Sequence, residues 1–147
     1  MGQIAAGRAP GQMKAVLGSC IGLAIYHSRL KVAAVAHIVL PESAGRNGTP
    51  GKFADTAVPE MMRLLKQLGT PMHGLTAKLA GGANMFGSSG PLQIGDANAE
   101  AVAVALKQVG IVDVVRDLGG TKGRRIVFDC ANGVMTVESP GQPPRIL

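Results

Sequence analysis

Two apolar stretches near the start of the chain, residues 20–27 and 32–39, show the clearest hydrophobic pattern in the sequence. Both are dense in β-branched and small apolar residues, and the polar segment HSRLK is the only interruption between them. This pattern predicts two neighbouring strands joined by a short turn near residues 28–30. Because residues equidistant from a turn pair across a hairpin, the beginning of the first strand should meet the end of the second.

The rest of the chain alternates between helical and strand-like patterns. Apolar residues at three- and four-residue steps predict helices at residues 52–68 and 96–109, each followed by a glycine that ends it. Asn132-Gly133 predicts a hairpin turn. Further strands are predicted at residues 13–19, 76–80, 111–118, 125–130 and 133–138.

About seven strands and two long helices predict an α+β fold in which helices cover sheet faces. The two hairpins exclude a purely parallel, doubly wound sheet. We expect one domain over residues 1–147, a length that can bury a real core. Residues 1–11 are expected to form a loose arm and residues 140–147 an irregular tail.

Cys20 and His37 lie at the two ends of the predicted hairpin that should meet. A thiol beside an imidazole is the arrangement of a Cys–His nucleophilic enzyme, in which thiolate attacks a carbonyl carbon. Gly18 and Ser19 precede the cysteine, so a turn there can direct backbone N–H groups at an oxyanion. Taken separately, a lone cysteine is more often a small buried hydrophobic residue, and a lone histidine in a strand a core residue.

Charge and composition narrow the possible partners only slightly. Lys and Arg number 15 against 9 Asp and Glu, but the basic residues are scattered except in GTKGRR, residues 120–125. One Tyr, three Phe and no Trp leave no stacking platform for single-stranded nucleic acid, so no nucleic-acid partner is expected. A basic surface facing an acidic protein partner fits the charge equally well.

The number of cysteines and the hydropathy of the sequence indicate the cellular compartment of the protein. The two cysteines, Cys20 and Cys130, are too few for a disulfide framework or a zinc site, which fits a reducing cytoplasm. No segment approaches 18 consecutive apolar residues, and the N-terminus lacks the apolar core of a signal peptide. We therefore expect a cytoplasmic protein without membrane insertion, metal or organic cofactor.

Several motifs, spread over most of the chain, carry a family resemblance: LGSCIGLAIY, AHIVLP, GKFADTAV, AKLAGGANMF, IGDANAEAV and DLGGTKGRRIVFD. In this order they resemble the CheD family of chemoreceptor glutamine deamidases. The resemblance implies a three-layer α/β/α sandwich with mixed, largely antiparallel sheets and two long helices. It also implies a cysteine-dependent protein-glutaminase that converts glutamine to glutamate on methyl-accepting chemotaxis receptors.

The family's catalytic cysteine falls on Cys20 and its histidine on His37. His37 would take the thiol proton, Cys20 would attack the amide carbon, and N–H groups near Ser19 would hold the oxyanion. Family members commonly carry a supporting threonine six residues before the cysteine, where this chain has Lys14. Either another group orients the imidazole, such as a backbone carbonyl or the Thr56 hydroxyl, or activity is weakened. A cationic Lys14 beside the site would favour a thiolate at Cys20.

Two glycine-rich loops, residues 45–51 and 81–90, are the natural walls of the groove that a protein-bound glutamine would enter. Gly81 and Gly82 allow a close backbone approach, and they are expected to contact substrate. Phe86 is either an exposed contact anchor or a ring folded back onto the core.

Two further functions stay open beside the deamidase. The protein could be a binding module that docks a CheC-type phosphatase of the chemotaxis adaptation system, with weak or no deamidase activity. A general thiol hydrolase or esterase would instead need a closed pocket. Ammonia release from receptor peptides, measured beside pull-down of the phosphatase, separates the first two functions.

Overall fold

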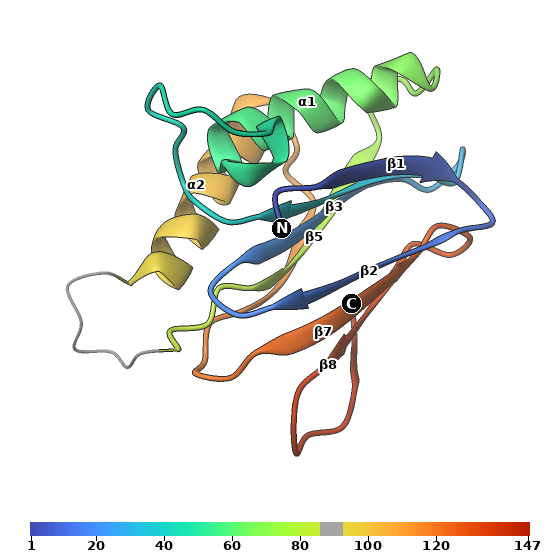
Figure 1. The fold of residues 1–147 in the computed structure, drawn as a ribbon. Helices are drawn as coiled ribbons and strands as arrows, with labels where there is room; N and C mark the ends of the chain where they lie inside the picture. The colour runs from blue at the N-terminus through green and yellow to red at the C-terminus, as the bar shows by residue number, and fades with distance from the viewer. Residues whose placement is uncertain (86–92) are drawn as a thin grey trace.

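The computed structural model describes residues 1–85 and 93–147 of the 147-residue chain. Figure 1 shows both helices on one side of the strands. In chain order the elements are β1 (Ile4–Arg8), β2 (Gln12–Leu17), β3 (Ile21–His27), β4 (Val32–Ile38), the 3₁₀ helix η1 (Pro50–Lys52), α1 (Ala54–Gln67), β5 (Leu75–Gly81), α2 (Ile94–Gln108), β6 (Val114–Leu118), β7 (Arg124–Asp129), β8 (Val134–Glu138) and β9 (Arg145–Ile146).

The central layer is a five-stranded sheet in the order β1-β4-β3-β5-β6. Its neighbouring strands are antiparallel except β5 and β6, which run parallel. The second sheet, in the order β2-β7-β8-β9, is antiparallel throughout. These features confirm the predicted α+β class, with mixed, largely antiparallel sheets and two long helices.

The layers follow the order helices, five-stranded sheet, four-stranded sheet, and not the α/β/α order that the family resemblance implies (Figure 1). The central strands explain this difference because both of their faces are apolar. Ile21 and Leu23 of β3 pack beneath the helices, whereas Ala24 and Tyr26 pack against the second sheet. A strand buried on both faces shows a continuous apolar run, and its sequence does not say what covers each face.

Both terminal segments contain a strand, so two predictions are wrong in part. The expected loose arm, residues 1–11, contains β1, which pairs with β4 over its whole length. An open strand edge gains backbone hydrogen bonds from any extended segment, and the Gly- and Ala-rich arm gives no apolar alternation that reveals this. The expected irregular tail, residues 140–147, contains the short strand β9, paired with β8. A single domain over residues 1–147 stays a prediction.

The predicted hairpin and both predicted helices are confirmed. In the hairpin, Ile21 lies opposite Ile38 and Gly22 lies opposite His37, so the beginning of β3 does meet the end of β4. A side chain at Gly22 would collide with the second sheet, since a Cβ atom there would lie 2.4 Å from Cδ1 of Ile126. Among the described residues, neither helix has the length and apolar character needed to cross a membrane.

Candidate active site

Cys20 ends the short turn that carries the chain from one sheet to the other. Leu17 is the last residue of β2 in the four-stranded sheet, and Ile21 is the first residue of β3 in the five-stranded sheet. Cys20 is 9% exposed and packs in the apolar layer between the two sheets. A short turn between two packed sheets leaves the thiol little freedom of position.

His37 lies one residue before the end of β4, directly opposite Gly22. Opposed residues of an antiparallel pair project from the same face, and so do residues two apart along a strand. Cys20 is two residues before Gly22, so its thiol and the His37 imidazole project from one face, toward the second sheet. Diagonal neighbours of this kind have Cα atoms about 7–8 Å apart, which side chains can bridge. The register of β3 and β4 therefore gives Cys20 and His37 neighbouring positions on one face of the central sheet.

The segment just before β1 holds the backbone of His37 on its other side. The N–H of Gly2 donates to the His37 carbonyl at 2.9 Å, and the His37 N–H donates to the Gln3 carbonyl at 3.0 Å. The arm that was expected to be loose therefore fixes the strand segment that carries the imidazole.

Burial shifts the two side chains toward their neutral forms. It raises the pKa of the Cys20 thiol above that of an ordinary cysteine, and it lowers the pKa of the His37 imidazole below that of an ordinary histidine. The free protein therefore holds a neutral thiol and a neutral imidazole at neutral pH.

Neither residue considered as a support for the imidazole hydrogen-bonds to it. Lys14 is exposed on β2, although it lines with His37 a small cavity of about 90 Å³. The Thr56 hydroxyl donates to the Pro50 carbonyl at 2.6 Å, at the beginning of α1, so it is not a substitute for the family's threonine. Nε2 of His37 is buried and has no partner within residues 1–85 and 93–147.

Asn98 of α2 fastens the two ends of the hairpin at the site. Its side chain is fully buried, and its Nδ2 donates to the carbonyls of Ser19 at 3.1 Å and Val39 at 2.9 Å. Beyond Ile21 and Ile38 the two strands no longer pair directly, and the Asn98 amide bridges the gap. Asn98 is not among the residues predicted for the site, although a polar side chain four residues before Val102 on an apolar helix face is a visible signal in the sequence.

The hydrogen bond from Asn98 to the Ser19 carbonyl also determines the direction of the Cys20 N–H. In a trans peptide the C=O and the following N–H point in opposite directions. Because the Ser19 carbonyl faces Asn98 and Val39, the Cys20 N–H faces away from them, toward the β5 side. Backbone contacts of Gly18 and Cys20 fit this geometry, since their carbonyls accept from Ala83 and Gly82. The described part of the chain offers no backbone acceptor to the Cys20 N–H, so it is free to bind an oxyanion.

Gly81 and Gly82 lie under the Cys20 turn. Gly81 has a positive φ of 112°, and a Cβ atom there would lie 2.2 Å from the Cys20 carbonyl oxygen. Gly82 also has a positive φ, and its backbone packs against Gly95 in the first turn of α2. Both glycines are buried and shape the turn, and their contact with substrate stays a prediction. Phe86 lies outside the described residues.

A thiol and an imidazole are the reactive groups of this region, and they need no metal ion to act as nucleophile and base. Among the described residues no group of three or more His, Cys, Asp or Glu side chains could hold a metal ion. The cavity that His37 lines is far smaller than the roughly 300–1,000 Å³ of small-ligand pockets. Cys20 does not line this cavity.

A family model described as CheD chemotactic sensory transduction matches residues 39–139, more than half of the chain. The chain belongs to the CheD family. The family match begins two residues after His37, so it covers neither Cys20 nor His37, and the evidence for their pairing is the geometry described above.

Curated CheD relatives extend the similarity over nearly the whole chain. A probable chemoreceptor glutamine deamidase CheD from Desulforamulus reducens is 41% identical over 136 residues, which cover 89% of this chain and 82% of that protein. The chemoreceptor glutamine deamidase CheD of Thermotoga maritima is 39% identical over 142 residues, 96% of this chain and 90% of that protein. A probable CheD deamidase from Methanococcus vannielii is 37% identical over 148 residues, covering 99% and 96%.

Proposed function

We propose that this CheD protein deamidates glutamine side chains of chemotaxis receptors to glutamate, with Cys20 as nucleophile and His37 as general base. The named activity of its relatives supports the reaction. The observation that supports the residue assignment is the register of β3 and β4, in which Gly22, two residues after Cys20, lies opposite His37 at the end of the hairpin. Methyl-accepting chemotaxis receptors are the protein substrates.

The reaction begins from the neutral pair. His37 takes the thiol proton as the Cys20 sulfur attacks the side-chain amide carbon, giving a tetrahedral intermediate. The Cys20 N–H binds the oxyanion, and a donor of this kind contributes roughly 10²–10³ in rate. His37 then returns the proton to the departing nitrogen, and ammonia leaves a thioester. Water, deprotonated by His37, attacks the thioester and releases glutamate and the free thiol.

The backbone around the nucleophile supports this mechanism through its rigidity. Gly81 packs against the Cys20 carbonyl, and Asn98 donates to the Ser19 carbonyl. The peptide groups before and after Cys20 are therefore both held in place. A donor that is already oriented needs no reorganisation when charge develops on the substrate oxygen. Gly18 and Ser19 then serve as the turn that presents this donor.

The reaction is tested by incubating a purified receptor fragment with the protein and measuring ammonia release. Peptide mass spectrometry of the fragment identifies which glutamines have become glutamate. We expect ammonia in a one-to-one ratio with new glutamate residues. Intact glutamines after prolonged incubation with folded protein would reject the deamidase function.

A second role follows from the missing threonine. With Lys14 in its place and no hydrogen-bond partner for Nε2 of His37 in the described residues, the imidazole lacks the support that the family commonly has. This favours docking of a CheC-type phosphatase at the same site, with weak deamidation. Pull-down of the phosphatase, combined with loss of ammonia release in its presence, would support docking. Unimpaired ammonia release at saturating phosphatase would reject a shared site. A cytoplasmic location stays a prediction.

A further inference from the structure

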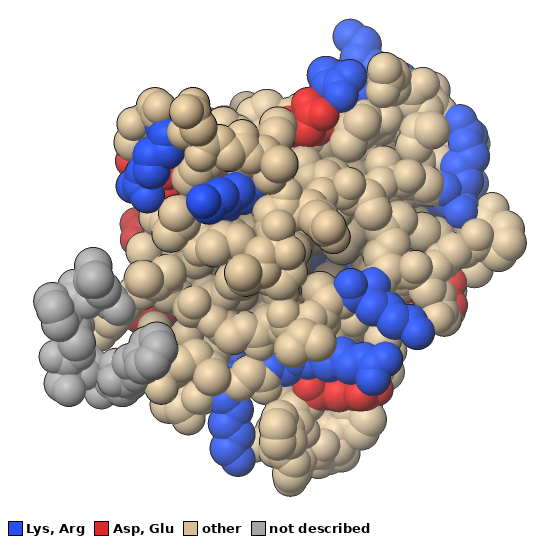
Figure 2. All heavy atoms as spheres, in the orientation of Figure 1, with Lys and Arg blue, Asp and Glu red and all other residues tan. Residues whose placement is uncertain are grey.

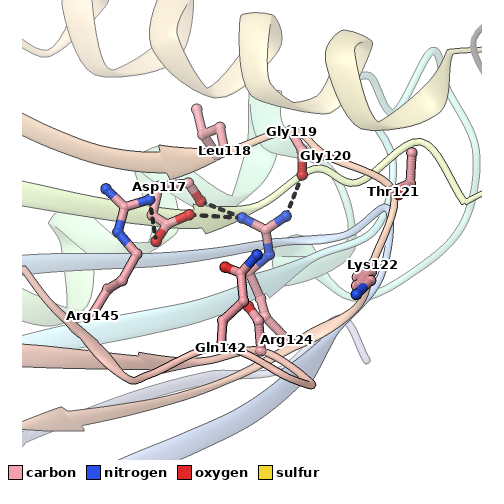
Figure 3. Close-up of a pocket in the computed structure, with 10 residues that line it drawn as sticks. Asp117, Leu118, Gly119, Gly120, Thr121, Lys122, Arg124, Gln142 and Arg145 are labelled. Carbon is pink, nitrogen blue, oxygen red and sulfur yellow. Dashed lines mark hydrogen bonds and ion pairs between the residues drawn. The ribbon is translucent and has the colours of Figure 1, made fainter.

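A second cavity, of about 320 Å³, opens at the end of β6 beside the loop that leads into β7. Figure 3 shows that its side chains come from β6, the loop, β7 and the C-terminal segment. The charged residues that line it are Asp117, Lys122, Arg124 and Arg145. Three cations against one carboxylate give the cavity a positive charge. Figure 2 shows that basic side chains also outnumber acidic ones on the face seen there.

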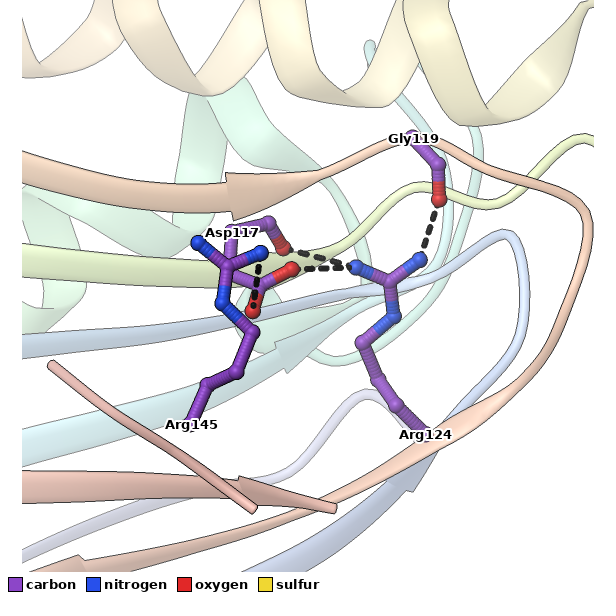
Figure 4. A network of polar contacts seen from close by, with 4 residues as sticks. All are labelled: Asp117, Gly119, Arg124 and Arg145. Carbon is purple, nitrogen blue, oxygen red and sulfur yellow. Dashed lines mark hydrogen bonds and ion pairs between the residues drawn. The ribbon is translucent and has the colours of Figure 1, made fainter. Parts of the chain in front are cut away.

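The single carboxylate of the cavity is already neutralised. Arg124 donates to the Asp117 carboxylate and to the Asp117 carbonyl, each at 2.9 Å, and also to the Gly119 carbonyl. Arg145 forms an ion pair with the other carboxylate oxygen at 3.4 Å. Figure 4 shows Asp117 held between the two guanidinium groups. Asp117 therefore compensates only one of the three cations, and the cavity keeps a net charge of +2.

Donors remain for an additional anion. Arg124 is 8% exposed, and its Nε is buried without a partner among the residues that the structure describes. The Arg145 side chain is 64% exposed, and it uses only one nitrogen on Asp117. Lys122 is exposed and forms no ion pair within residues 1–85 and 93–147. A carboxylate that entered the cavity would gain charge-assisted hydrogen bonds from the exposed Lys122 ammonium and from the Arg145 nitrogens that Asp117 does not use.

The cavity and the nucleophile lie at the same end of the sheets. The register across β3, β5 and β6 aligns Ile21, Gly81 and Leu118. Ile21 follows Cys20 and Leu118 lines the cavity, so the two are separated by two strand spacings, roughly 10 Å. The connecting backbone is continuous, because Gly119 donates to Gly81 and Asn84 donates to Gly120. Figure 1 shows the turn before β3, the segment after β5 and the loop before β7 gathered at this end.

We infer that this cavity is a carboxylate-binding subsite for the protein substrate. It receives an Asp or Glu side chain that lies roughly 10 Å from the glutamine bound at Cys20, and Lys122, Arg124 and Arg145 supply the cationic donors. The inference rests on the proposed deamidation of receptors. It adds a specificity rule, namely that a glutamine with an acidic neighbour at this distance is preferred over one without.

The test compares two double variants with the same net charge. Lys122→Ala/Arg145→Ala removes the exposed cations of the cavity and leaves the buried Arg124 in place. Lys66→Ala/Lys107→Ala removes two exposed lysines from the last turns of α1 and α2. Each pair is combined with Cys20→Ala, and binding of a receptor fragment is measured by titration calorimetry, which does not depend on turnover.

We expect the cavity variant to bind the fragment roughly fivefold or more weakly, the size of one or two exposed charge pairs, and the control variant to match the Cys20→Ala parent. A fragment whose acidic residues near the glutamine are replaced by alanine should bind both variants equally. With Cys20 present, KM should rise while kcat stays within twofold. The subsite would be overturned if both double variants weakened binding of the fragment equally, or if the intact fragment did not bind at all. It would also be overturned if the two variants still differed in their affinity for the alanine-substituted fragment. Absence of ammonia release from the wild-type protein would instead reject the deamidase function.

Discussion

The Asn98 side-chain amide donates a 3.1 Å hydrogen bond to the Ser19 carbonyl, the backbone group immediately before the nucleophile. The same amide nitrogen donates to Val39, so one buried side chain spans the gap where β3 and β4 separate. Helix α2 thereby fixes the peptide that carries the Cys20 N–H. The turn that carries Cys20 lies at the junction of the two sheets, and it is held by a helix that packs on the opposite face of the central sheet.

Asn98→Ala removes both of these hydrogen bonds and leaves two carbonyls without a donor. We expect the free energy of unfolding to fall by about 1–3 kcal/mol, and kcat to fall tenfold or more because the oxyanion donor is no longer held. Denaturant unfolding and ammonia release measure the two effects. Asn132→Ala is the control, since Asn132 accepts one exposed hydrogen bond from Val134 in a distant hairpin. Wild-type kcat in folded Asn98→Ala would show that these two hydrogen bonds have no role in the reaction.

The acid limb of the activity profile reports the protonation of His37. His37 must be neutral to accept the thiol proton, so kcat/KM falls as the pH drops through its pKa. Burial lowers this pKa, and activity should therefore persist to a lower pH than an ordinary imidazole would allow. The profile is measured with a receptor fragment under saturating and subsaturating conditions. An acid limb above the range of an ordinary histidine would mean that a neighbouring negative charge, such as a thiolate, dominates over burial.

Alkylation rates distinguish a neutral Cys20 from a preformed thiolate. Burial raises the pKa of Cys20, so its reaction with iodoacetamide should be slow at neutral pH and accelerate as the pH rises. Cys130 is fully buried and should react more slowly still. Lys14→Ala should leave the Cys20 rate within about twofold, because the exposed Lys14 side chain is not a cause of the shift. Fast alkylation that is independent of pH, and lost in Lys14→Ala, would restore the thiolate hypothesis.

Gly81→Ala tests the fit of the backbone beneath the nucleophile. The new Cβ would overlap the Cys20 carbonyl oxygen, and φ of 112° is a conformation that alanine avoids. We expect the free energy of unfolding to fall by about 1–3 kcal/mol. We also expect kcat to fall by more than this loss of stability would explain. Gly69→Ala provides the comparison, because Gly69 also has a positive φ but meets no atom within 4 Å. If Gly81→Ala keeps the kcat of Gly69→Ala, the packing under Cys20 is not needed for catalysis.

The hairpin, and with it the register between Gly22 and His37, could be predicted from the sequence because both depend on local order. Apolar runs with a short polar break define the strands, and the turn position fixes the register. The two helices were predictable for the same reason, since their apolar faces repeat along the chain.

The missing parts depend on contacts between distant segments. Strand β1 pairs through backbone groups alone, and its small side chains leave no pattern in the sequence. The layer order depends on which element covers each face of β3 and β4, and a strand that is apolar on both faces does not record it. Asn98 acts through carbonyls 79 and 59 positions away, so its partners could not be predicted from the helix.

Ammonia release by Cys20→Ala, compared with Cys130→Ala, tests the central assignment most directly. Both variants remove one buried thiol, but Cys130 packs at the end of β7 in the second sheet and takes no part in the proposed reaction. With folding of each variant checked by circular dichroism, we predict no ammonia above background from Cys20→Ala and near wild-type release from Cys130→Ala. Release by Cys20→Ala at the wild-type rate would contradict the account.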